Sequence, residues 1–234
     1  MKETSLLYKQ ILSDLAHYKE WRVQIGNDYY EDSYVSARIT RSLYSNNIIG
    51  GTFSASLDLI LKDVESDSIP KMAQIKLSVR LVSPVLGASS EWIPKGTFWI
   101  NTRTKNKADG TIEFQCVDAM MFGEQLFYGE NDDIIWNNET MRTVAKMCAE
   151  RMGITLEDPL QFFNQAPYIL TAPPIGWTIR QILSGIAVAH CGNIIVTENN
   201  QLRLVPLYSI PEETNYLINE NGEAIMFGGG RILV

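Results

Sequence analysis

Apolar residues recur at helical spacing at the start of the chain. Between residues 5 and 20 they fall three or four positions apart, and most charged residues occupy the positions between them. The apolar positions are Leu7, Tyr8, Ile11, Leu12, Leu15 and Tyr18. The pattern predicts an N-terminal amphipathic helix within residues 1–20, and its apolar stripe must dock on another part of the protein.

From Trp21 onward the apolar period changes to two residues, which is typical of half-buried antiparallel strands. Apolar and polar residues alternate around Leu57 and again around Leu77, and further strands are expected at 21–26, 34–44, 96–104 and 111–118. Asp109 and Gly110 stand between the last two and indicate a hairpin. About six such strands predict a small antiparallel β-barrel over residues 21–127.

A helical pattern returns after Gln125. Asn137 or Asn138 is expected to cap a helix that Gly153 closes. One face of this helix carries Met141, Val144, Ala145, Cys148 and Met152. Thr178 and Gln181 have the spacing of a capping box, which predicts a second helix that is largely buried.

The remaining segments favour short strands. Residues 193–197 and 202–207 predict a hairpin, and residues 215–227 offer one or two more strands. The last residues, 228–234, look like a turn that enters an unfinished strand, so we expect a piece of a longer protein. The predicted fold is therefore mainly β, of the α+β class. It consists of the helix, the small barrel over residues 21–127, and an α+β domain over residues 128–234 with two helices, a hairpin and the beginning of a second barrel.

Composition supports a folded protein and narrows its partners. The chain has 234 residues, 45% hydrophobic and 20% charged, enough to bury a sizeable core. A net charge of -7 weighs against sequence-independent binding to nucleic acid. Three widely spaced cysteines favour reduced thiols over a disulfide framework. No run of 18 apolar residues or export signal is evident, so we expect synthesis in the cytoplasm and no membrane insertion.

The sequence contains none of the searched motifs for a nucleophile elbow, a phosphate loop, a zinc site or a calcium loop. His190 and Cys191 are adjacent, but they are expected to lie at the end of the second helix without further metal ligands. The acidic run 130–133 is expected to be a solvated loop. Two carboxylate pairs, Glu113 with Asp118 and Asp58 with Asp63, have the residue types of a glycosidase, but charges on the outer face of strands explain them without any activity. We therefore expect no enzyme activity, cofactor or metal.

Seven segments follow one another in a distinctive order, at residues 51–59, 69–73, 91–100 and 116–120 and then at 174–183, 189–193 and 202–207. Their order and spacing resemble the N-terminal part of phage and prophage tail proteins of the baseplate hub type. The resemblance covers most of residues 50–234, whereas the leading helix is less familiar.

This resemblance implies a structural role in the virion tail. Hub proteins of this kind look like trimers whose barrels form a ring that joins the tail tube to the tip. It thus implies a homotrimer that also contacts other tail proteins, with DNA passing through the lumen without specific binding. An acidic inner wall would repel DNA. Candidate assembly residues are Trp92, Phe98, Trp99 and Trp136.

Two alternatives remain open. Hub-type proteins can carry a cell-wall hydrolase, which an assay of peptidoglycan release would detect. The tryptophans could instead belong to a carbohydrate-binding module that recognises the host surface, and binding to glycans that is lost when Trp92 and Trp136 are replaced would favour it.

Overall fold

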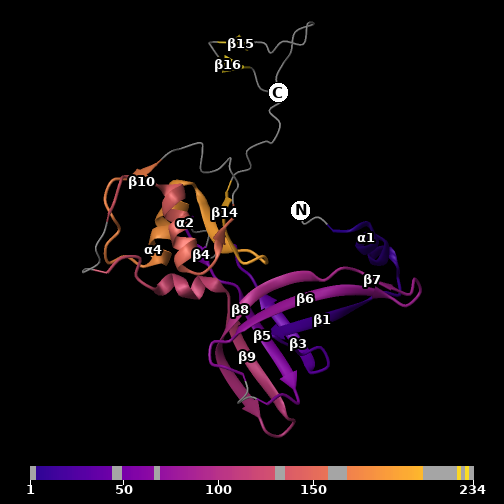
Figure 1. Cartoon of the computed structure of the whole chain (residues 1–234). Helices are drawn as coiled ribbons and strands as arrows, with labels where there is room; N and C mark the ends of the chain where they lie inside the picture. The colour runs from indigo at the N-terminus through magenta and orange to yellow at the C-terminus, as the bar shows by residue number, and fades with distance from the viewer. Residues whose placement is uncertain are drawn as a thin grey trace.

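The computed structural model has a large curled sheet beside a smaller unit that contains two helices (Figure 1). It describes residues 4–43, 49–65, 69–129, 135–157 and 168–207, and the backbone of the short strands β15 (Met226–Phe227) and β16 (Gly230–Arg231). The α+β class and the antiparallel pairing of the large sheet are as predicted. The expected segments in 130–133 and most of 208–234 lie outside the described residues.

The N-terminal helix α1 (Leu6–Ser13) is shorter than predicted. The Ser5 hydroxyl caps it by accepting a hydrogen bond from the Tyr8 amide at 3.0 Å. It ends because Asp14 takes an extended backbone conformation, and the Asp14 carboxylate accepts a hydrogen bond from the Ala16 amide at 3.1 Å. The chain then turns into the first strand, so Leu15 and Tyr18 lie outside the helix.

The large sheet contains eight strands. These are β1 (Tyr18–Ile25), β2 (Asp28–Tyr29), β3 (Tyr34–Thr40), β5 (Ser56–Lys62), β6 (Gln74–Ser83), β7 (Ala88–Ser89), β8 (Ile93–Asn106) and β9 (Thr111–Val117). Their order is β2-β1-β6-β8-β9-β5-β3, with β7 paired to β6, and every pair is antiparallel. The hairpin expected at Asp109 and Gly110 is confirmed, because β8 pairs directly with β9.

The two ends of this sheet approach each other without forming a hydrogen-bonded barrel. Alternate residues point inward and fill the interior with aliphatic and aromatic side chains, among them Leu57, Leu77 and Phe114. Trp21 of β1 stacks on Tyr34 of β3 at 6.0 Å between ring centroids. In the described residues this ring contact bridges the two ends, where no strand pairing joins them. The barrel expectation was therefore right about curvature and wrong about closure.

The second unit packs helices on a four-stranded sheet. Helix α2 (Met141–Arg151) and helix α4 (Ile179–Ala189) are accompanied by the 3-10 helix η2 (Ala119–Glu124). The sheet order is β11 (Thr155–Leu156), β14 (Gln201–Pro206), β13 (Gly192–Val196) and β4 (Thr52–Phe53). A further pair joins β10 (Glu139–Thr140) to β12 (Ile169–Leu170).

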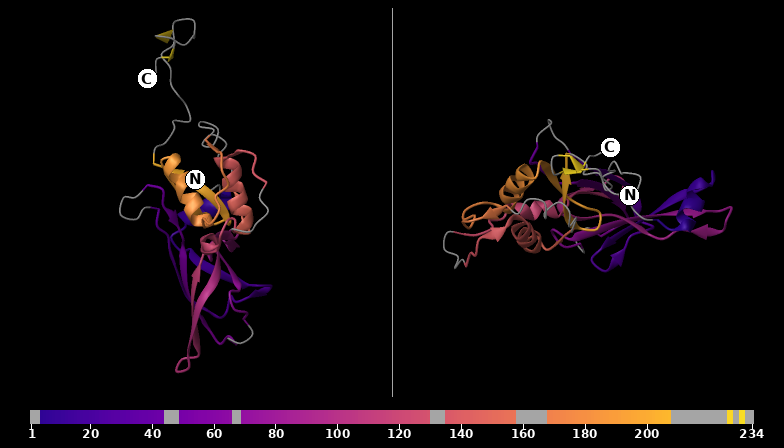
Figure 2. Two further views of the ribbon diagram at one scale, coloured as in Figure 1. Left: turned by 90° about the vertical axis from the view of Figure 1, so that its left-hand side faces the viewer. Right: turned by 90° about the horizontal axis from the view of Figure 1, so that it is seen from above.

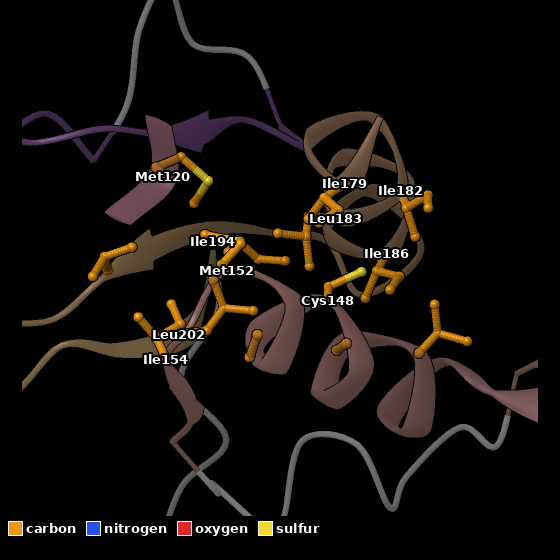
Figure 3. Close-up of a cluster of buried hydrophobic side chains, with 14 of the residues drawn as sticks. Met120, Cys148, Met152, Ile154, Ile179, Ile182, Leu183, Ile186, Ile194 and Leu202 are labelled. Carbon is orange, nitrogen blue, oxygen red and sulfur yellow. The ribbon is translucent and has the colours of Figure 1, made fainter. Parts of the chain in front are cut away.

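Buried aliphatic and sulfur-containing side chains from both helices and the sheet form one core (Figure 3). Those labelled there are Met120, Cys148, Met152, Ile154, Ile179, Ile182, Leu183, Ile186, Ile194 and Leu202. The capping box of Thr178 and Gln181 is confirmed, and so is the hairpin of β13 and β14. The cap of α2 is Thr140 rather than Asn137 or Asn138, because its hydroxyl accepts the Thr143 amide at 3.1 Å.

Strand β4 connects the two units. It precedes β5 of the large sheet, but it pairs in parallel with β13 of the smaller sheet. Views from two further directions show α2 and α4 together at one end of the long sheet, whereas α1 lies toward its other end (Figure 2). The chain thus crosses between the units at β4 and again at η2, which follows β9.

Candidate assembly surfaces

Trp92 lies on the outer face of the large sheet, where two arginines cover it. The guanidinium carbons of Arg22 and Arg80 lie 4.0 Å and 4.6 Å from its ring centroid. Both arginines also pair with carboxylates, Arg22 with Glu31 at 2.5 Å and Arg80 with Glu20 at 2.7 Å. The Trp92 ring is therefore held by two cation–π contacts, and each of the two arginines is itself held by an ion pair. Trp92 is partly buried, and its ring already contacts two arginines of its own chain.

Phe98 and Trp99 are neighbours on β8 and point to opposite faces of the sheet. Phe98 is 1% exposed and fills the interior, so its ring is a core element and not a surface on which a partner could dock. Gly96 has a φ of +145°, and a Cβ there would approach the Phe98 ring to 2.6 Å. Trp99 is half-buried on the outer face and meets Phe122 edge to face at 5.2 Å. It therefore ties the large sheet to η2 and the second core.

Trp136 belongs to the second unit and is also half-buried. Its Nε1 donates a hydrogen bond to the Leu170 carbonyl at 2.8 Å, and its ring meets Tyr128 edge to face at 6.4 Å. The four predicted aromatics therefore do not form one cluster, since two lie on the outer sheet face, one in the sheet interior and one in the second unit. Their role in assembly stays a prediction.

A buried polar junction at the crossing of the chain was not anticipated. Asp118 is 3% exposed, and its carboxylate accepts the amides of Ala55 at 2.7 Å and Met120 at 3.0 Å. It thereby caps η2 and fixes the start of β5. Arg180 donates to the carbonyls of Thr52 at 2.9 Å and Met120 at 3.1 Å, and it pairs with Glu124 at 2.5 Å.

Burial has the largest effect on the pKa of the Asp118 carboxyl group. Removal from water raises the pKa of Asp118 to about 6, although its hydrogen bonds and the charge of Arg180 act in the opposite direction. The sequence signal for this site was present but weak, since Asp118 directly before a short apolar segment is a helix-cap pattern. The partner Arg180 could not be paired with it without the fold.

Two exposed apolar surfaces lie at different ends of the molecule. The first, which we call the α1 surface, consists of Leu6, Leu12 and Leu15 on and just after α1. The helix rests against β6 and β7 at the end of the large sheet, away from the other helices (Figure 1). Ile11 is its fully buried side chain.

The second surface, which we call the α4 groove, follows the outer side of α4. Two adjacent hollows of about 360 Å³ and about 450 Å³ share Trp177 and Gly185. Trp177 is exposed at one end and Val188 at the other. None of the described residues that line these hollows is charged. The groove therefore presents an uncharged apolar face on an acidic protein.

The histidine, cysteine and carboxylate side chains that the sequence offered as candidates for chemistry are either far apart or have structural contacts. His190 caps the C-terminal end of α4 and meets Tyr168 edge to face at 5.7 Å, and burial lowers its pKa. Cys191 is exposed, whereas Cys116 and Cys148 are buried, and burial raises the pKa of both thiols to about 12. Of the predicted carboxylate pairs, Glu113 is exposed on β9 while Asp118 is enclosed in the junction.

Within the described ranges, no group of three or more His, Cys, Asp or Glu side chains is placed to hold a metal ion. The described helices have at most 11 residues, and none of them is long and apolar enough to cross a bilayer.

The sequence matches no protein-family model and no curated protein. Solved structures do resemble it. The 43 kDa tail protein of prophage MuSo2 from Shewanella oneidensis aligns with a TM-score of 0.54 at 13% identity, over 85% of this chain and 59% of that protein. The tail protein from Neisseria meningitidis MC58 aligns with a TM-score of 0.50 at 12% identity, over 88% of this chain and 53% of that protein.

The chain thus spans less than two thirds of either tail protein. At such low identity the similarity concerns the fold alone. Within that limit, the fold of this chain resembles part of the fold of these two tail proteins.

Proposed function

We propose that the chain is a structural component of a phage or prophage tail, acting by assembly and not by catalysis. The observation that carries this proposal is the shared fold with two tail proteins over 85% and 88% of the chain. Because at least 85% of the chain aligns, the agreement includes residues of both units and not only the large sheet.

The surface of the chain is consistent with such a role. Among the described residues β3 and β4 each stand at the end of their sheet, and sheet edges of this kind can accept strands of neighbouring subunits. The α1 surface and the α4 groove add exposed apolar area. We propose that these features join copies of the chain into a ring, a homotrimer of the baseplate hub type, which connects the tail tube to the tip and contacts other tail proteins.

The decisive experiment uses the particle. A phage or prophage whose copy of this gene is deleted should yield particles that lack a normal tail tip in electron micrographs, and complementation should restore the tip. A tagged chain should be found at one end of purified tails by immunogold labelling. Intact tails after deletion, or absence of the tagged chain from purified tails, would refute the proposal.

The proposed passage of DNA can be tested separately. A net charge of -7 predicts no measurable binding to double-stranded DNA at physiological salt, because too few cations are available to release counterions from phosphates. A fluorescence anisotropy titration measures this. Binding that weakens steeply with salt would contradict a lumen through which DNA passes without adhesion.

A further inference from the structure

Several apolar side chains on and just after helix α1 are exposed in the single chain. Leu6 is 72% exposed, Leu12 is 52% exposed, and Leu15, directly after the helix, is fully exposed. The one charged residue of the helix is Lys9. The apolar residues of an amphipathic helix are normally covered, yet in α1 only Ile11 is completely buried, and Leu6, Leu7 and Leu12 are exposed. Its composition therefore suits a helix that is covered from a second side.

The attachment of α1 keeps it at the far end of the sheet. At its start, Glu91 accepts hydrogen bonds from the Ser5 amide at 2.9 Å and from the Ser5 hydroxyl at 2.5 Å. At its end, the Ser83 hydroxyl donates to the Asp14 carboxylate. These two contacts clip the helix to β6 and to the segment after β7, while α4 belongs to the other unit (Figure 1).

The α4 groove has complementary properties. Its hollows are open because Gly185 carries no side chain, and a Cβ placed there would meet nothing within 4 Å. An occupant with a charged face would lose hydration without finding an opposite charge among the described lining residues. Apolar side chains at helical spacing are what such a groove accepts. Among the described helices, α1 is the one that displays several exposed leucines.

We propose that α1 of one copy docks in the α4 groove of the next copy. The inference rests on the proposed function, since it names the contact by which copies of the chain join. The two surfaces lie at different places on the molecule, so the interface is head-to-tail. An open assembly therefore keeps one free α1 at one end and one free groove at the other until a ring closes.

Two variants of the full chain separate the two sides of this contact. Leu12→Lys with Leu15→Lys removes the α1 surface, and both positions are exposed, so the fold is retained. Gly185→Arg fills the groove, and arginine is a better helix former than glycine. Each variant alone should associate at least about tenfold more weakly than the parent chain in sedimentation velocity runs over a range of concentrations.

An equimolar mixture of the two variants is the sharpest test. The Gly185→Arg chain retains its α1 and the other variant retains its groove, so one contact can form and the mixture should yield a dimer that grows no further. As a matched control, Met72→Lys changes an exposed apolar residue in the turn before β6 and should associate like the parent.

Several outcomes would overturn the docking proposal. They are a parent chain that stays monomeric at all concentrations, variants that associate like the parent, and a mixture that stays monomeric while the parent assembles. Failure here leaves the tail role to be decided by the particle experiment, which does not depend on this contact.

Discussion

At the scale of single residues, the least replaceable positions are polar and lie between the two units. Asp118 and Arg180 satisfy amides and carbonyls of β4, of η2 and of Ala55, just before β5, that would otherwise lack these partners. The aromatic residues that attract attention in the sequence have more ordinary tasks, as Phe98 fills the sheet interior and Trp136 anchors a loop through Leu170. Buried hydrogen bonding, and not aromatic content, marks the critical residues here.

Asp118 gives stability a specific dependence on pH. Its pKa is about 6 in the fold and near 3.8 when unfolded, so between these values the folded state binds more protons. The contribution of this group to the free energy of unfolding is therefore largest below pH 4 and falls by on the order of 2 kcal/mol as pH rises to 6. Urea unfolding at several pH values measures it.

The variant Asp118→Asn isolates this effect. It should be less stable than the parent by about 1–3 kcal/mol at pH 4.5, because one of two backbone amides loses its acceptor, and the difference should shrink toward pH 7. His190, whose pKa burial lowers, acts in the opposite direction below pH 6.5 and cancels in the comparison. A difference that stays constant with pH would contradict the assignment.

Arg180 should not tolerate replacement by lysine. Its guanidinium reaches two carbonyls and Glu124 at once, and a single ammonium cannot do so. We expect Arg180→Lys to lower the free energy of unfolding by about 1–3 kcal/mol in urea titrations. Arg38→Lys, at an exposed position on β3, is the matched control and should change it by less than about 0.5 kcal/mol. Equal effects at both positions would remove the special role of the junction.

At the scale of elements, the hydrophobic period predicted most of the strands and all three described α-helices, while their ends depended on polar contacts. Strands β5, β6 and β9 follow from strict alternation, and α4 follows from its capping box. The predicted helix from Ser5 to Glu20 was too long because apolar spacing continues past Asp14, where the side-chain contacts of Asp14 turn the chain. Short elements that depend on distant partners, such as β4 beside β13, leave no periodic signal.

Helix α1 should detach without unfolding the sheet on which it rests. The Ile11→Ala variant removes its fully buried side chain, worth about 2–4 kcal/mol at a core position. Hydrogen exchange should then become faster at the amides of α1, while the amides of β6 and β8 keep their protection. Gln10→Ala, on the same helix at an exposed position, should leave exchange unchanged. Loss of protection throughout the sheet would show that α1 is part of the main core.

At the scale of the whole molecule, two hydrophobic cores are joined by a few contacts. One core fills the curled sheet and the other lies between the helices and the small sheet. The chain passes between them at β4 and η2, and the Trp99 ring reaches from the large sheet to the second core. The sequence pattern does not predict this connection between the units, because each residue involved fits the ordinary pattern of its own strand or helix. The candidate assembly site was equally hidden, since Gly185 contributes only empty space.

Trp99 tests whether the two units unfold as one. Because the Trp99 ring packs on Phe122 and is half-buried, Trp99→Ala should cost about 2–3 kcal/mol, mostly as lost contact between the units. The parent should show one calorimetric transition whose calorimetric and van't Hoff enthalpies agree, whereas the variant should show two separated transitions. Trp92→Ala removes a tryptophan that contacts the large sheet only, so it should lower the single transition temperature without splitting it. Splitting in both variants would mean that the units are coupled elsewhere, and splitting in neither would mean that the junction of Asp118 and Arg180 suffices to hold them together.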